Sequence, residues 1–341
     1  GTGQDGVNMG AFGIGCYQET IEPPDTLWTR TYEGSGDDNG YAVEQTLDGG
    51  YIIAGHTYSD NSDVWLIKTD SNGDTVWTNT FGGTASDWGR FVQQTSDNGY
   101  IIIGYTESYG SGEEDIWLIK TDSFGDTLWT NTFGDIYNNW AYHGQQTLDG
   151  GYIIAGTTTT PNNSSDFWLI KTDENGNEQW NQTFGGGEAE SSRFIQQTMD
   201  GGYIVTGATY SYGSGQSDVW LIKIDENGNE QWNQTFGGNN NDDAYAVQEI
   251  EVGRYIILGR TESYGNGSMD AWLIHYNTNG TGYWDQTFGG SQWDVGWAID
   301  RTIDDGYIIA GWTDSNGDGT SDCWLVKTDS TGNEEWDLSF D

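Results

Sequence analysis

The sequence predicts an all-β protein, a β-propeller of six four-stranded blades. The first observation is a repeat of about fifty residues, in which two tryptophans recur with most steps 51 or 52 residues long. The second is that each repeat holds four short segments rich in Ile, Val, Trp, Tyr and Thr, which are residues that strands favour. No helical periodicity of useful length occurs. Four strands in a repeat of this length, six times over, are typical of a propeller.

The two tryptophans define the repeats. One lies in the third strand, at Trp65, Trp117, Trp168, Trp220, Trp272 and Trp324. The other lies in the fourth strand, at Trp28, Trp77, Trp129, Trp180, Trp232, Trp284 and Trp336. They divide a propeller domain, 26–341, into repeats of about 28–77, 77–129, 129–180, 180–232, 232–284 and 284–336, with a closing strand at 335–340. Residues 1–25 lie outside the pattern as an N-terminal extension.

The first complete repeat gives the order of the elements. Strand one surrounds Val43, strand two covers residues 51–57, strand three begins at Asp63, and strand four surrounds Trp77. The turns between strands one and two and between strands three and four contain Asp-Gly-Gly and Asn-Gly, which supply the positive φ angles that tight hairpins need. Strands two and three are apolar on both faces, as expected for sheets that stack on one another.

These motifs resemble known repeat families. The recurring D-G-G-Y-I-I-A-G and D-x-W-L-I-K-T-D segments resemble WD-repeat and kelch-like propellers, and especially secreted prokaryotic repeat proteins. Residues 1–15 resemble the last coil of a secreted right-handed β-helix. The resemblance implies a propeller fold and leaves function open, because propellers host enzymes, lectins, adhesins and scaffolds.

The charge balance limits the partners. The chain has 53 acidic and 11 basic residues, a net charge of −42. Binding to nucleic acid needs clustered Lys and Arg, so we expect no nucleic-acid partner. No run of 18 apolar residues occurs, so no membrane insertion is expected. The few lysines and six Asn-x-Ser/Thr sequons favour an extracellular or cell-surface location.

The fourth-strand motif occurs seven times, whereas each of the first three strands occurs six times. One copy of the fourth strand is therefore surplus. The surplus copy is either residues 27–32 or residues 335–340. Six blades are the preferred interpretation. Seven blades are the alternative, and would need their missing strands from residues 1–25. An unpaired strand edge can pair with another chain, so we expect the surplus strand to mediate self-association.

Candidate binding residues are those that vary between otherwise similar repeats. Near the start of strand one these are Tyr41, Arg90, Tyr142, Arg193, Tyr245 and Trp297. After the strand-two glycine they are His56, Tyr105, Arg260 and Trp312, with Thr157 and Ala208 in the other two repeats. Aromatic and Arg side chains can stack on sugars or anchor a protein. The alternative interpretation is packing between blades.

A calcium loop is a second candidate. Asp314, Asn316, Asp318 and Asp322 stand at relative positions 1, 3, 5 and 9, with Gly at position 6, as at the start of an EF-hand loop. The Glu expected at position 12 is replaced by Leu325. The Asp that precedes every third strand is expected instead to cap its loop.

Catalysis has little support. The three histidines, His56, His143 and His275, have no Ser or Cys nucleophile identifiable by spacing. The two cysteines, Cys16 and Cys323, are candidates for a disulfide bridge. The sequence therefore predicts a non-catalytic module for adhesion or assembly. The alternative is a lectin or a carbohydrate-active enzyme.

Overall fold

The structure is a computed structural model that describes residues 28–34, 36–159, 161–162, 164–315 and 320–340. These ranges contain 24 strands. None of the described segments is a helix long and apolar enough to cross a bilayer. The predicted N-terminal extension lies outside the described residues.

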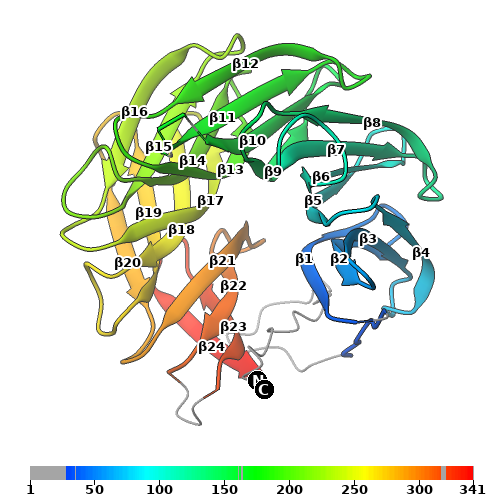
Figure 1. Cartoon of the computed structure of the whole chain (residues 1–341). Coiled ribbons are helices and arrows are strands. Elements are labelled where there is room, and N and C mark those ends of the chain that lie inside the picture. Colours follow the sequence, from blue (N-terminus) through cyan, green and yellow to red (C-terminus); the bar gives the residue numbers. More distant parts are fainter. Residues whose placement is uncertain (1–27, 35, 160, 163, 316–319, 341) are drawn as a thin grey trace. The chain divides into compact units, whose positions relative to one another are not determined.

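Every four consecutive strands form one antiparallel sheet, giving six sheets in the order of the sequence. These are the blades of a six-bladed β-propeller, so the predicted fold class is confirmed (Figure 1). Blades one to three form one compact unit and blades four to six a second.

The first unit contains three blades. Blade one is β1 (Asp38–Gln45), β2 (Tyr51–Tyr58), β3 (Ser62–Thr69) and β4 (Thr75–Phe81). Blade two is β5 (Asp87–Gln94), β6 (Tyr100–Thr106), β7 (Asp115–Thr121) and β8 (Thr127–Phe133). Blade three is β9 (Asn139–Gln146), β10 (Tyr152–Thr159), β11 (Ser165–Thr172) and β12 (Glu178–Phe184).

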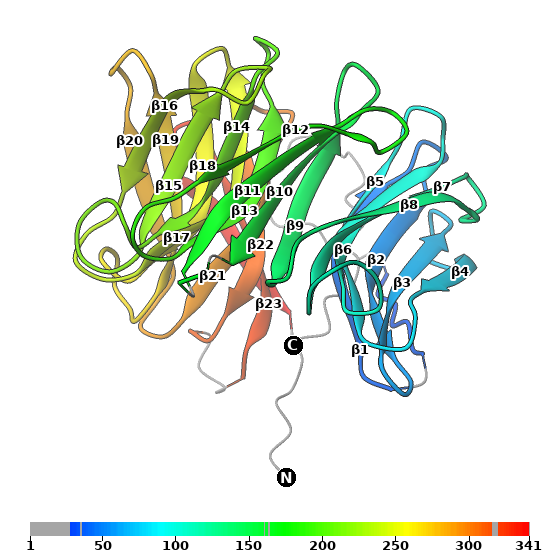
Figure 2. The same cartoon turned by 45° about the horizontal axis from the view of Figure 1, so that its top comes forward.

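The second unit repeats this arrangement. Blade four is β13 (Glu190–Gln197), β14 (Tyr203–Thr209), β15 (Asp218–Ile224) and β16 (Glu230–Phe236). Blade five is β17 (Asp242–Glu251), β18 (Arg254–Thr261), β19 (Asp270–Asn277) and β20 (Trp284–Phe288). Blade six is β21 (Asp294–Arg301), β22 (Tyr307–Thr313), β23 (Asp322–Thr328) and β24 (Glu334–Phe340). Figure 2 shows blade six beside blade five within this unit.

The core lies between neighbouring blades. In blade two every residue of β6 and β7 is buried, so strands two and three of this blade are covered on both faces, as expected. Between blades one and two, Ile52, Leu66, Ile102 and Trp117 belong to one buried cluster. Burying a large apolar side chain contributes about 1.5–3 kcal/mol, so the interfaces between blades stabilise the fold.

All five lysines of the chain are buried at one repeated position near the end of strand three. In blade two the Lys120 ammonium lies 2.9 Å from the carboxylate of Asp97, in the turn between strands one and two, and donates to the Thr121 carbonyl at 2.8 Å. We call this arrangement the lysine strut. It recurs at Lys68–Asp48, Lys171–Asp149, Lys223–Asp200 and Lys327–Asp304. Because a buried charge needs a partner, the strut ties two hairpins of one blade together.

The fourth-strand tryptophans link successive blades. Trp77 of β4 lies edge-on to Tyr100 of β6, with ring centroids 5.8 Å apart. Trp129 of β8 repeats this contact on Tyr152 of β10, also at 5.8 Å. The C-terminal copy of the motif is β24, which pairs with β23 and completes blade six. The surplus copy is therefore the N-terminal one.

Candidate ligand-binding site

The six candidate residues of strand one share one backbone feature. In each blade the pairing of strands one and two shifts by one residue, which leaves a β-bulge near the start of strand one. The unpaired residues are Tyr41, Arg90, Tyr142, Arg193, Tyr245 and Trp297. A bulge re-aims a side chain and is common beside functional sites.

The strand-two glycine makes this bulge sterically feasible. In blade two a Cβ atom on Gly104 would collide with the carbonyl oxygen of Trp88, which lies just before the bulge. Only glycine therefore fits opposite the bulge, and the residue after it, Tyr105, lies near the bulge residue Arg90. This explains why the two variable positions found in the sequence meet in the structure.

In the first unit the candidate residues form one cluster around Arg90. Its guanidinium carbon lies 4.1 Å from the ring centroid of Tyr41, and Nη2 donates to the Tyr105 hydroxyl at 2.5 Å. Tyr142 lies farther from the guanidinium, at 6.0 Å. His56 contacts Tyr41, with ring centroids 5.6 Å apart. The cluster thus brings together five of the ten candidate residues.

The Arg90 cluster carries a positive charge in an acidic protein. Its Nε is buried and has no hydrogen-bond partner, and no carboxylate of the described residues forms an ion pair with its guanidinium. Burial first, and the charge of Arg90 second, lower the pKa of His56. The lowered pKa favours the neutral form of His56. The chemistry suits binding of an anionic or planar group between aromatic rings.

In the second unit four candidates form another cluster. Tyr245 and Trp297 lie with ring centroids 4.2 Å apart, and Trp312 packs on the buried group that includes Tyr245. Arg260 is bound by Asp243, with Nη2 and Oδ2 2.6 Å apart. Trp297 leaves 42% of its surface exposed. This cluster therefore offers an open aromatic face and a neutralised arginine.

The remaining sequence predictions have different outcomes. Arg193 is half-buried at the bulge of β13. The predicted calcium loop lies partly outside the described residues, including Asn316 and Asp318, so its metal site stays a prediction. Within the described ranges, no group of three or more His, Cys, Asp or Glu is arranged to hold a metal ion. Cys16 also lies outside these ranges, while Cys323 is half-buried on β23.

The Asp before strand three caps its loop, as the repeat predicts. Asp270 accepts hydrogen bonds from the backbone N–H groups of Asn266 and Gly267, at 3.0 and 3.1 Å. Asp218 accepts one from Ser214 at 2.7 Å. Burial raises the pKa of Asp218 to about 6. These carboxylates serve the loops of the repeat.

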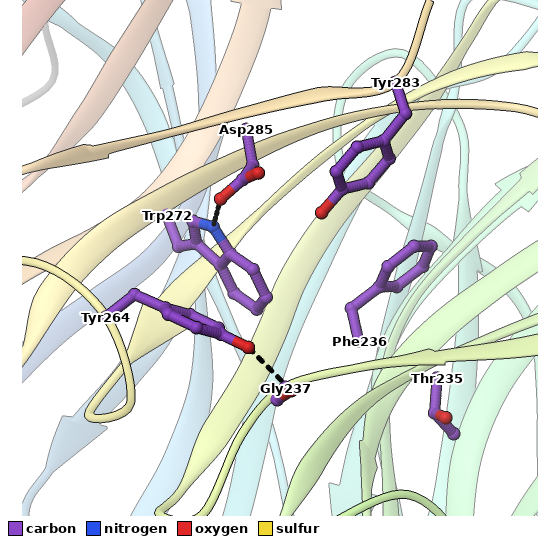
Figure 3. Close-up of a pocket in the computed structure, with 7 residues that line it drawn as sticks. All are labelled: Thr235, Phe236, Gly237, Tyr264, Trp272, Tyr283 and Asp285. Carbon is purple, nitrogen blue, oxygen red and sulfur yellow. Dashed lines mark hydrogen bonds between the residues drawn. The ribbon is translucent and has the colours of Figure 1, made fainter. Parts of the chain in front are cut away.

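A pocket of about 330 Å³ in the second unit is absent from the sequence predictions (Figure 3). It is lined by Thr235, Phe236, Gly237, Tyr264, Trp272, Tyr283 and Asp285. A sequence signal exists: Tyr283 and Asp285 flank Trp284, where blades three and four both carry Gln and Asn. Those differences lie at the fourth-strand motif, whereas the predicted binding residues lie near the start of strand one and after the strand-two glycine.

The comparisons with known proteins extend to the fold only. No protein-family model and no curated protein matches the chain. A Dyadobacter fermentans protein of unknown function is similar in structure, with a TM-score of 0.50, 11% identity, and coverage of 89% of this chain and 95% of that one. A mutant of puromycin hydrolase has a TM-score of 0.54 at 12% identity, covering 89% of this chain and 46% of the hydrolase. Sqt1 from Chaetomium thermophilum has a TM-score of 0.50 at 10% identity, covering 89% and 72%. Neighbours this distant in sequence share an architecture that serves many functions.

Proposed function

We propose that the chain is a non-catalytic extracellular or cell-surface module for adhesion and assembly, which associates with copies of itself through the surplus N-terminal strand motif. The supporting observation is the place of Trp28. Its ring lies edge-on to Tyr51 of β2, with centroids 5.8 Å apart. Trp77 and Trp129 make the same contact with the blade that follows them.

Neighbouring residues strengthen this likeness. Trp28 also packs over Gly73 in the hairpin between β3 and β4, as Trp77 packs over Gly125 in the next blade. The Arg30 guanidinium lies 3.3 Å from Asp74, and the Tyr32 hydroxyl donates to the Gly73 carbonyl at 2.7 Å. Residues 28–32 therefore occupy the position that the fourth strand of a preceding blade takes elsewhere.

In residues 28–32 the side chains pack against blade one, whereas the backbone forms no strand pair within the described part of the chain. Among the described residues, no strand pairs with residues 28–32. Unpaired N–H and C=O groups accept an added strand, and main-chain hydrogen bonds then supply the affinity. The exposed outer edge of a fourth strand in a second copy is a matching partner. A head-to-tail contact of this type need not close, so it can extend into a filament.

Charge opposes this assembly. At −42 per chain, two copies repel each other unless salt screens the charges or a divalent cation bridges them. We therefore expect association to strengthen with added sodium chloride or calcium. A greater effect of calcium at equal ionic strength would support the calcium loop at Asp314.

Light scattering tests the proposal on three chains: the full chain, a deletion of residues 1–34, and a matched deletion of residues 1–25 that keeps the surplus motif. We expect the full chain and the shorter deletion to associate in high salt or calcium, and the longer deletion to stay monomeric. A full chain that is monomeric in every condition would contradict the proposal. Equal association of both deletions would also contradict it.

Glycan binding is the second candidate, favoured by the exposed face of Trp297 beside Tyr245 and Trp312. Aromatic faces of this type stack on sugar rings. On a glycan array, Trp297→Ala and Trp312→Ala should each abolish binding. Tyr210→Ala is the control, because that exposed tyrosine of the same unit lies outside the cluster. Retained binding in the tryptophan variants would exclude this candidate.

A further inference from the structure

The pocket beside blade five has walls made mostly of aromatic rings. Tyr283 stacks on Phe236 of β16, with centroids 6.3 Å apart and the planes 10° from parallel. Tyr264 lies 5.2 Å from the ring of Trp272. Figure 3 shows these four rings around one space, with Asp285 at its rim. A volume of about 330 Å³ is at the small end of the range for ligand pockets.

Hydrogen bonds within the protein hold the aromatic walls of the pocket in place and occupy the polar groups of these side chains. The Trp272 Nε1–H donates to Asp285 Oδ2 at 3.0 Å, and the Tyr264 hydroxyl donates to the Gly237 carbonyl at 2.9 Å. Burial, and then the charge of Asp285 and a hydrogen bond to it, raise the pKa of Tyr283. The donors of Trp272, Tyr264 and Tyr283 are therefore committed to the protein itself.

The electrostatics of the pocket favour a positive charge. Aromatic faces carry negative potential, Asp285 contributes a carboxylate, and none of the described residues that line the space is basic. A sugar would need several free donors and acceptors, and the three committed donors do not supply them. A methylated ammonium group needs few or none, because it binds through ring faces and a nearby negative charge.

We propose that this pocket binds the methylated ammonium group of an organic cation. The pocket and the surplus N-terminal motif share no residue, so this site is independent of the proposed assembly function. The same chemical group occurs on choline-type small molecules and on methylated lysine side chains of proteins. Both sources present the cation at the end of a narrow chain that a pocket of this size admits.

Tyr283, which closes the pocket, is specific to blade five, whereas the carboxylate recurs in blade six as Asp337, which accepts a hydrogen bond from Trp324 Nε1–H at 3.1 Å. In blade four, Gln231 and Asn233 stand in place of Tyr283 and Asp285. There Trp220 Nε1–H donates to Asn233 Oδ1 at 3.3 Å. Blade four therefore shows that an amide can replace the carboxylate without loss of the tryptophan hydrogen bond. Asp285→Asn thus removes the charge and keeps the tryptophan hydrogen bond.

Isothermal titration calorimetry on the full chain tests the site with choline, with its neutral carbon isostere dimethylbutanol, and with a peptide that carries trimethyl-lysine. We expect saturable binding of at least one cation and at least about tenfold weaker binding of the neutral isostere. Asp285→Asn and Tyr283→Gln should each weaken cation binding by a similar factor. Tighter binding of choline would identify a small molecule as the source, and tighter binding of the peptide a protein side chain.

A matched pair of variants separates the site from general effects on the fold. Tyr264→Leu should weaken cation binding. Tyr212→Leu should not, although Tyr212 makes the same contacts in blade four, with its ring 5.2 Å from Trp220 and its hydroxyl bonded to the Gly185 carbonyl at 2.9 Å. Equal binding of choline and its isostere would overturn the proposal. So would an absence of saturable binding of both cations, or equal losses in the two tyrosine variants.

Discussion

Blades two and five show what the lysine strut contributes to a blade. In blade two, Lys120 is buried beneath the turn that carries Asp97, and its partner side chain is 56% exposed. The charge is thereby paired on one side and bonded to the Thr121 carbonyl on the other. A buried ammonium without those partners would cost several kcal/mol.

Blade five has lost both members of the pair. His275 stands at the lysine position, and Val252 stands where the turn aspartate would be. The His275 ring stacks on Trp284 at 5.2 Å and 10°, and its Nδ1 lies 2.7 Å from the Gly282 carbonyl oxygen. Losing the lysine and the aspartate together leaves no unpaired charge, which is why the change is tolerated.

The difference teaches that the strut restrains the hairpin between strands three and four. In blade two β8 begins at Thr127, two residues before its tryptophan, whereas in blade five β20 begins at Trp284 itself. Gly280 and Gly282 before it have φ of +75° and +72°, which glycine adopts without strain. Tyr283 is thus free of the ladder and stacks on Phe236. The blade without a strut is the one that forms the pocket.

Lys120→Met gives the largest expected effect. It should lower the free energy of unfolding by about 2–4 kcal/mol, because it leaves Asp97 without its ion-pair partner and the Thr121 carbonyl without its donor. Water can partly replace the lost partner of Asp97. His275→Ala should cost less than about 1 kcal/mol, since it removes one ring contact and one hydrogen bond. Urea unfolding of both variants measures the difference, and equal losses would break the comparison.

Acid should weaken the strutted blades first. The Thr46 hydroxyl, followed by Lys68, lowers the pKa of Asp48 to about 2, and the Thr302 hydroxyl, followed by Lys327, lowers that of Asp304 to about 2. A carboxyl whose pKa falls on folding stabilises the protein at pH values above its ordinary pKa, near 3.8. This stability is lost as the pH falls towards 2. We expect amide protection in β1 and β2 to fall between about pH 4 and pH 2.

Blade five is the internal control for this effect, because its turn between β17 and β18 has no strut to lose. Hydrogen exchange measured between pH 4 and pH 2 should show a smaller loss of protection there than in the turn of blade one. A uniform loss across all blades would mean that the struts do not set local stability.

The fold could be predicted from the sequence because the same four-strand pattern occurs in it six times. The expected strand two at residues 51–57 differs from β2 by a single residue. The bulge of strand one could not be predicted, since its residue varies among Tyr, Arg and Trp and has no turn signature. The meeting of Arg90 with Tyr41 and Tyr105 depends on packing between two blades. No spacing along the chain encodes that contact.

The pocket and the lysine struts could not be predicted from the sequence for a related reason. The aligned repeats place His275 where the other blades carry Lys, but the missing partner at Val252 lies 23 residues away and is recognisable only once the two hairpins are seen together. Phe236 and Tyr283 belong to different blades, so their stacking is a property of the interface. Comparing aligned repeats reveals which residues differ, and the structure reveals which differences meet.

Restoring the strut in blade five gives the smallest expected effect and the sharpest test of the comparison. His275→Lys alone should destabilise the chain, because the ammonium gains no carboxylate partner. Val252→Asp alone should be nearly neutral, since Val252 is 72% exposed in a turn that tolerates Asp. The double variant should recover the loss, with a favourable coupling of about 1 kcal/mol in a double-mutant cycle measured by urea unfolding. Additive effects would show that the turn between β17 and β18, which pairs Glu251 with Arg254, has moved too far to let the two charges meet. In that case the strut and its turn must have been lost together, and blade five could not return to the regular form by exchanging side chains alone.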